Sequence, residues 1–228
     1  MPLRGYQLQF STKILLKTIF FLRLKKNTTE KLYNSKILRT FAAENDSMMK
    51  FEELVKDKLW AVREDDEDCH ALEILLDQWN DVVWLNAFFV ENQIDLLSYY
   101  FVSIEEAIMH TIEDSGKLES ALLQLAENED LDRLFRPLDN NETGNSLLQK
   151  DKAKLKDRPR HSSWLRVYAI RLSNGAYIIT GGAIKLTRTM AERGHTQAEL
   201  EKIERVRNYL LSEHIIDDES FIDYIAEL

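Results

Sequence analysis

The residues best suited to chemistry lie between residues 164 and 189, where basic and aromatic side chains recur on two short apolar runs. Arg166 and Tyr168 belong to the first run, Lys185 ends the second, and Arg188 follows it. A guanidinium binds phosphate in a bidentate manner, and an ammonium acts as a point charge. An aromatic ring beside them offers a surface on which a base can stack. This set predicts a phosphate-binding face, and the alternative is an ordinary solvated face.

A β-hairpin would bring these side chains together. Residues 164–172 and 176–185 flank Asn174-Gly175, the strongest short signal for a two-residue type I′ turn. In that register Ser173 pairs with Ala176, Tyr168 with Gly181, Arg166 with Ala183 and Trp164 with Lys185. Alternation then predicts one face of Trp164, Arg166, Tyr168, Ile170, Tyr177, Ile179 and Lys185, and a second, helix-packed face of Leu165, Val167, Ala169, Ile178 and Ile184. A bulge at Gly181-Gly182 would change this register.

A second group of cations precedes the hairpin. They alternate with other residues and comprise Lys150, Lys152, Lys154, Lys156, Arg158 and Arg160. This segment follows a turn-rich break at residues 140–145 and predicts a basic loop. Two interpretations stay open, a mobile arm that grasps phosphate and a solvated linker.

Charge is segregated along the chain, although the net charge is −9. Residues 1–47 hold nine basic and three acidic side chains, and residues 48–140 hold seven and 23. Residues 141–207 hold 14 basic and seven acidic side chains, and the last 21 residues hold six acids and no base. A basic block suits contact with phosphate, because Lys and Arg displace condensed counterions. Two merely solvated surfaces are the alternative.

Composition points to a packed, intracellular protein. Hydrophobic residues make up 44% of the 228 residues, with seven Gly and three Pro. The single cysteine, Cys69, excludes an internal disulfide, which fits a reducing compartment. Cys69 lies beside His70, but zinc normally takes four such ligands, so a structural thiol is expected. We predict a cytoplasmic location, no metal and no cofactor.

The first 47 residues differ in character from the rest. The apolar run Ile14–Leu22 is interrupted by Lys17 and is too short to span a membrane. The segment lacks the cleavage signature of a secretory signal. A cationic mitochondrial-type presequence and a mis-assigned upstream start are the two interpretations, and Met48-Met49 favours the second. We expect residues 1–47 to be a poorly ordered extension and residues 48–228 to form one domain without membrane contact.

The remaining elements predict an α+β fold, with a helical N-terminal half packed on a small antiparallel sheet that contains the hairpin and closed by a C-terminal helix. Leu59–Arg63 is expected as the first strand, and a helical stripe runs from Leu72 toward Phe89. The other predicted features are a capping box at Ser103 and Glu106, a helix over Lys117–Ala126, a second capping box at Thr196 and Glu199, and an acidic tail that packs back through Phe221.

The runs Leu165–Ile170 and Tyr177–Thr189 resemble the RelE/HigB toxin superfamily, in its phage-derived HigB-type branch. Gly182-Ala183-Ile184-Lys185-Leu186-Thr187-Arg188-Thr189 lies over that branch's glycine-to-threonine stretch, and Leu134–Leu138 over the segment before the strands. Gly181 stands where the family often has a His, and Leu186 replaces its second Lys. The helical region at about 70–130 is longer than the usual two-helix hairpin.

The resemblance implies a toxin of a toxin–antitoxin system that cleaves mRNA, usually on the ribosome, and is neutralised by a cognate antitoxin. The reaction would be attack of a 2′-hydroxyl on the adjacent phosphate, which needs a base, an acid and stabilisation of charge. By this resemblance Lys185 and Arg166 hold the phosphate, Arg188 is a second clamp, and Tyr168 orients or stacks. His195, with an ordinary pKa near 6.5, is the candidate for proton transfer.

Two other classes of function are alternatives to an RNA-cleaving toxin. A non-catalytic interaction protein, or a degenerate relative of such toxins, would use the acidic helices to bind a basic partner. A sequence-specific DNA-binding protein is disfavoured, because no helix-turn-helix carries the basic cluster.

Overall fold

In the described part of the chain, two strands are followed by four α-helices, four more strands and two α-helices, and the strands join into one sheet. The computed structural model describes residues 49–128, 130–138, 148–156, 162–173 and 175–227. They belong to a unit that spans Met48–Leu228. The predicted extension of residues 1–47 lies outside the described residues, as do Arg158 and Arg160.

Six strands form the sheet in the order β1-β2-β6-β5-β4-β3. Their bounds are β1 Lys50–Val55, β2 Leu59–Arg63, β3 Phe135–Pro137, β4 Gln149–Ala153, β5 Leu165–Arg171 and β6 Tyr177–Ile184. Neighbouring strands are antiparallel except β2 and β6, which run parallel. The α+β fold is therefore confirmed, and the sheet is larger than predicted and mixed.

Six α-helices cover the sheet in the described part of the chain. They are α2 Ala71–Asn80, α3 Val82–Glu91, α4 Gln93–Tyr99, α5 Ile104–Glu127, α6 Gly194–Ser212 and α7 Asp218–Glu227. Single turns of 3-10 helix, η1 Leu131–Arg133 and η2 Met190–Glu192, precede β3 and α6. None of the helices in these described ranges is long and apolar enough to cross a membrane.

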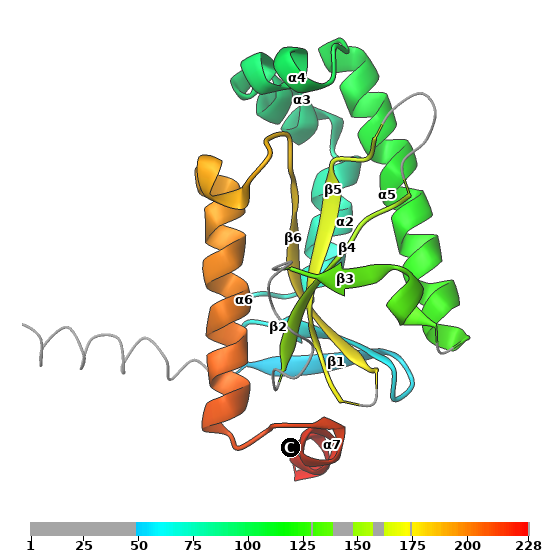
Figure 1. The fold of residues 1–228 in the computed structure, drawn as a ribbon, viewed down its shortest axis with the longest axis vertical. Helices are drawn as coiled ribbons and strands as arrows, with labels where there is room; N and C mark the ends of the chain where they lie inside the picture. The colour runs from blue at the N-terminus through cyan, green and yellow to red at the C-terminus, as the bar shows by residue number, and fades with distance from the viewer. Residues whose placement is uncertain (1–48, 129, 139–147, 157–161, 174, 228) are drawn as a thin grey trace, which may run out of the picture. The chain divides into compact units, whose positions relative to one another are not determined.

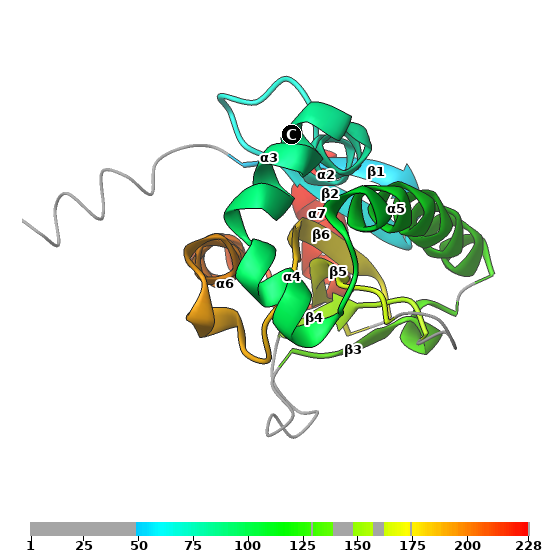
Figure 2. The same ribbon diagram turned by 90° about the horizontal axis from the view of Figure 1, so that it is seen from above.

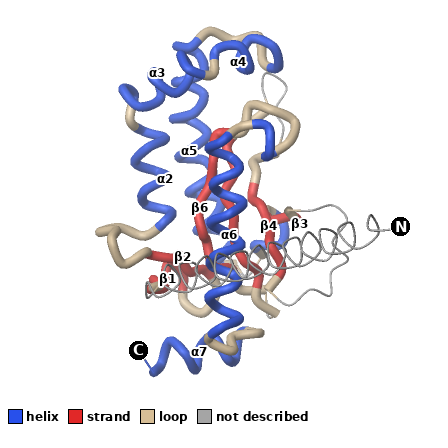
Figure 3. The backbone as a smooth tube through the Cα atoms, turned by 90° about the vertical axis from the view of Figure 1, so that its left-hand side faces the viewer, coloured by secondary structure: helices blue, strands red, loops and turns tan. Residues whose placement is uncertain are grey.

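Both faces of the sheet are covered, and each has its own apolar core. Helices α2 to α5 pack on one face, whereas α6 and α7 pack on the other (Figures 1 and 2). Trp79, Phe89 and Trp164 are among the large side chains of the first core. In the second core the ring of Phe221 on α7 packs edge-on against Trp60. Helices α3 and α4 lie at one end of the sheet and α7 at the other (Figures 1 and 3).

The helix ends agree only in part with those predicted from the sequence. The predicted capping box at Ser103 is present, and α5 continues through the separate helix expected at 117–126. The stripe predicted to run from Leu72 to Phe89 is broken at Asp81, whose carboxylate accepts hydrogen bonds from the first N–H groups of α3. The capping box predicted at Thr196 is wrong, because α6 already begins at Gly194.

The hairpin between β5 and β6 has the predicted long-range register but a different turn. The Leu172 N–H donates to the Ala176 carbonyl at 2.8 Å, so the loop contains three residues rather than two. Gly175 has a φ of +83°, as a three-residue loop with a left-handed glycine requires. Further along, Tyr168 pairs with Gly181 as predicted.

A β-bulge restores that register. The partners change from Ala169 with Ile179 to Tyr168 with Gly181, which leaves Thr180 as the extra residue. Between the turn and the bulge the two faces are therefore exchanged on β6. Tyr177 and Ile179 lie in the core under α2 and α5, and Ile178 lies in the core under α6, opposite to the prediction. Trp164 likewise lies in the first core, before β5 begins.

Candidate phosphate-binding cavity

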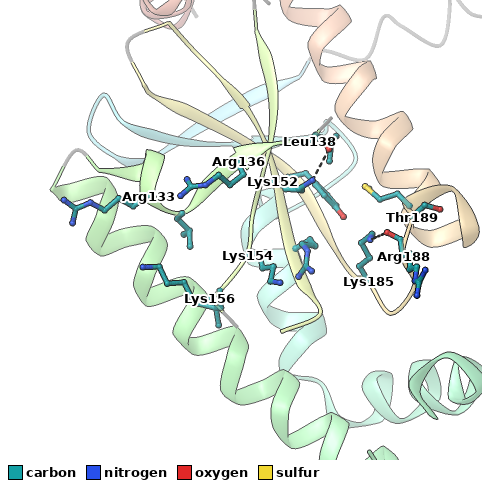
Figure 4. Close-up of a pocket in the computed structure, with 14 residues that line it drawn as sticks. Arg133, Arg136, Leu138, Lys152, Lys154, Lys156, Lys185, Arg188 and Thr189 are labelled. Carbon is teal, nitrogen blue, oxygen red and sulfur yellow. Dashed lines mark hydrogen bonds between the residues drawn. The ribbon is translucent and has the colours of Figure 1, made fainter. Parts of the chain in front are cut away.

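A cationic cavity of about 650 Å³ opens on the sheet face that carries α6 (Figure 4). Its cations come from η1, β3, β4, β5 and the segments after β4 and β6. They are Arg133, Arg136, Lys152, Lys154, Lys156, Arg166, Lys185 and Arg188. Leu134, Leu138, Leu155, Tyr168, Thr189 and Met190 complete the wall. No carboxylate is among these described lining residues, so the wall carries one sign of charge.

Strand register explains why the cations meet. Arg136 on β3 pairs with Lys152 on β4, and Lys152 pairs with Tyr168 on β5. Tyr168 in turn pairs with Gly181 on β6. Directly opposed residues lie on the same face of a sheet, and like charges placed so destabilise it. An anion bound over this row would offset the repulsion between Arg136 and Lys152.

Main-chain carbonyl groups orient several of these side chains. Arg166 Nη1 donates to the carbonyl oxygens of Ser163 and Leu165 at 2.8 and 2.7 Å. Lys152 Nζ donates to Leu138 O at 3.0 Å. Such bonds fix the direction in which each cationic side chain points.

Lys185 directly follows β6 and lines the cavity. Its Nζ donates to the carbonyl oxygen of Thr187 at 3.0 Å. It also donates to the carbonyl oxygen of Arg188 at 2.5 Å (Figure 4). Burial, and then the positive charges of Arg166 and Lys152, lower the pKa of the Lys185 amine. A lysine with a lowered pKa loses its proton more readily than an ordinary surface lysine.

Tyr168 forms part of the cavity wall but is only 1% exposed. Its ring cannot present a face for a base to stack on, which argues against that part of the predicted role. Burial raises the pKa of the Tyr168 phenol by more than the positive charge of Arg166 lowers it, and the carboxylate of Glu199 adds a smaller increase. The hydroxyl therefore stays protonated, and within the described chain no partner for its hydrogen bond is found.

The cavity brings together most of the residues singled out from the sequence. Arg166, Tyr168, Lys185 and Arg188 from the hairpin line it together with Lys152, Lys154 and Lys156. The predicted basic loop is wrong over residues 149–153, which form β4. Alternation along that strand points Lys152 into the cavity, so part of the segment is rigid rather than a mobile arm.

Two predicted site residues lie elsewhere. His195 is not part of the cavity wall, because its Nε2 lies 2.9 Å from Ile184 O and its ring packs edge-on against Phe88. Lys150 points toward α6, where its Nζ forms an ion pair with Glu204 at 2.9 Å. Neither residue can reach a ligand in the cavity from this position.

Two cavity cations were missed in the sequence. Arg133 and Arg136 flank the end of η1 and the start of β3, in the acidic half of the chain. The only signal for them was the short Leu134–Leu138 segment, which proves to contain an edge strand. Its three-residue length is below what alternation can reveal.

Cys69 has no features of a catalytic or metal-binding thiol. Desolvation, and then the carboxylates of Glu73, Asp77 and Asp68, raise the pKa of the Cys69 thiol, which keeps it protonated. No cluster of three or more His, Cys, Asp or Glu side chains that could hold a metal ion occurs in the described ranges.

Comparisons of the chain with protein-family models, with curated proteins and with solved structures gave no match.

Proposed function

We propose that the cationic cavity binds the phosphodiester backbone of RNA and that the chain cleaves RNA there, as the toxin of a toxin–antitoxin pair. The observation that carries this proposal is the set of eight cations around one cavity, with no carboxylate among the residues of its wall that the structure describes. Such a wall favours a nucleic-acid backbone as its ligand, because each contact of Lys or Arg with a phosphate releases a condensed counterion. The resemblance of the hairpin to RelE/HigB toxins supports the choice of RNA.

The buried position of Tyr168 limits which parts of an RNA the cavity can contact. With its ring 1% exposed and the other non-cationic wall residues aliphatic or small, the cavity offers no aromatic face for a base. Contacts would be to phosphate and sugar, which position a nucleic acid without reading its sequence. The proposal therefore expects binding with weak dependence on base sequence.

The cleavage step needs only groups that the cavity supplies. The amine of Lys185, in its neutral form, would accept the proton of a 2′-hydroxyl as O2′ bonds to the adjacent phosphorus. The bond from phosphorus to O5′ would break, and O5′ would take up the proton that Lys185 had accepted, leaving a 2′,3′-cyclic phosphate and a 5′-hydroxyl. Arg166 and Arg188 would stabilise the extra negative charge on the phosphorane. Lys185 thus replaces His195 as the candidate base, because Lys185 lines the cavity and His195 does not.

Binding and cleavage are tested separately on the full chain. Binding of a labelled 12-nucleotide single-stranded RNA is measured between 50 and 200 mM salt for the wild type, Arg166→Ala, Lys154→Ala and the control Lys50→Ala. Lys50 pairs with Asp65 outside the cavity. Each cavity variant should lower the slope of log affinity against log salt by about 0.7, and the control should leave the slope unchanged.

Cleavage is followed by the appearance of cyclic-phosphate products and by growth arrest on expression. Lys185→Ala should abolish both while retaining most of the RNA affinity. If the wild type binds RNA but does not cleave it, cleavage is refuted and only the RNA-binding part of the proposal stands. The proposal is refuted if the cavity variants and the control lose affinity equally, or if the wild type does not bind RNA. The acidic helices would then remain as the functional surface.

A further inference from the structure

Exposed apolar side chains are concentrated at one end of the molecule. Ten large hydrophobic residues are exposed in the described part of the chain, and eight of them lie in α3, α4, the loop after it and the start of α5. We call these eight the α3–α4 cap: Val82, Val83, Val90, Ile94, Leu97, Tyr99, Phe101 and Met109. Single exposed apolar residues are ordinary, but a group of this size marks an interaction site.

Helix α3 is apolar on its outer side as well as its inner side. Leu85 and Phe89 are fully buried toward the sheet, whereas Val83 is 80% exposed and Val90 is 54% exposed. A helix that is apolar all round is normally covered on all sides. Within the described chain the outer side of α3 has no such cover, so another molecule would complete its packing.

Phe101 adds a conformational argument. It follows α4 with a φ of +57°, and its N–H donates to Leu96 O at 3.2 Å, which closes the helix end. Glycine is the residue that favours this left-handed position, and a bulky residue there is strained. The ring is nevertheless 83% exposed and gains little from packing within the described part of the chain. Strain retained at an exposed aromatic points to a role in contact with a partner.

Charge identifies the kind of partner. No Lys or Arg occurs between Arg63 and Lys117, and exposed Glu91 and Glu105 lie on the same helices as the cap. Two copies of the chain joined through this surface would bring acidic side chains against each other. A polypeptide that carries both apolar and basic side chains would match the apolar residues and neutralise the acids.

We propose that the α3–α4 cap docks a basic amphipathic helix of another protein, with apolar anchors spaced three and four residues apart and Lys or Arg beside them. Phe101 and Ile94, the two most exposed apolar side chains of α4 and its end, supply the main contacts. This docking surface is distinct from the cationic cavity and does not depend on its function.

The test uses the full chain and a labelled synthetic 18-residue helix with leucine on one face and lysine on the other. The control peptide carries glutamate in place of each lysine. The basic peptide should bind at least tenfold more tightly than the acidic one and should weaken as salt increases. Phe101→Gly should weaken binding about tenfold without lowering the melting temperature, because glycine relieves the strain. Ile94→Ser should act similarly, and Ile222→Ala, on exposed α7, should have no effect.

Three outcomes would overturn the proposal. Equal affinity for both peptides would mean that charge plays no part. Undiminished binding by both Phe101→Gly and Ile94→Ser would place the peptide elsewhere. A concentration-dependent dimer in sedimentation, dissociated by Phe101→Gly, would assign the cap to a second copy of the chain.

Discussion

Two adjacent glycines on β6 allow a sharp test of how tightly the sheet and α2 are packed. A Cβ atom built at Gly182 lies 2.8 Å from Leu75 Cδ1 and even closer to the main-chain oxygen of Arg166. Neither neighbour can move easily, because Leu75 is buried in the core and the oxygen belongs to β5. Gly182→Ala should therefore force β6 away from both α2 and β5.

The size of the effect follows from these contacts. Ordinary van der Waals contact begins near 3.4 Å, so the gap toward Leu75 must open by roughly 0.6 Å. Overpacking of this kind costs about 1–3 kcal/mol, and the involvement of backbone favours a value of about 3 kcal/mol. For a unit of this size the melting temperature should fall by about 6–12 °C.

Gly181→Ala is the matched control. A Cβ atom there meets only the carboxylate of Glu199, the end of a flexible side chain that can swing aside. A loss of about 1 kcal/mol is expected from such a displacement. Both variants are compared by thermal and urea unfolding. Equal losses, or a smaller loss for Gly182→Ala, would refute the packing described between β6, α2 and β5.

Three further changes are predicted to alter stability. Tyr177→Phe removes the hydroxyl that donates to Asp132 at 2.7 Å and should lower the free energy of unfolding by about 1–2 kcal/mol in urea titrations. Ser103→Ala removes the cap of α5 and should cost about 1 kcal/mol, measured in the same way. Burial raises the pKa of Glu199, so its contribution is full below the unfolded pKa of about 4.5 and is lost as pH rises through the folded pKa. Glu199→Gln should therefore reduce the loss of melting temperature between pH 4.5 and 7, and an unchanged difference would contradict the assignment.

Away from the turn, the strand register of the hairpin agrees with the prediction, although the predicted turn is wrong. Asn-Gly favoured a two-residue turn, but the Leu172 to Ala176 hydrogen bond closes a three-residue loop. The bulge at Thr180 then adds one residue to β6. The two shifts cancel, so Arg166 still lies opposite Ala183. The Gly181-Gly182 pair indicated a possible bulge next to Thr180, but Thr180 itself looks like any other strand residue.

The cavity residues could be predicted where a basic side chain lies in a segment with the alternating pattern of a β-strand. Arg166 and Lys185 were placed correctly relative to each other by pairing alone. Lys152 was recognised as basic but not as part of a strand, because charged residues are depleted in strands and its segment lacks an apolar run. His195 could not be placed, since its position depends on where α6 begins and on its contact with Phe88.

The parallel pairing of β2 with β6 also bears on how the protein is made. Leu59 and Tyr177 are neighbours in the sheet although roughly half of the chain separates them. Closing so long a loop is slow, and proteins dominated by distant contacts fold slowly. During synthesis β1 and β2 would leave the ribosome as a two-stranded ribbon, which is marginally stable by itself. The hairpin that lines the cavity would join it only when most of the chain has emerged, so a polypeptide truncated before β6 should have neither a completed sheet nor a ligand site.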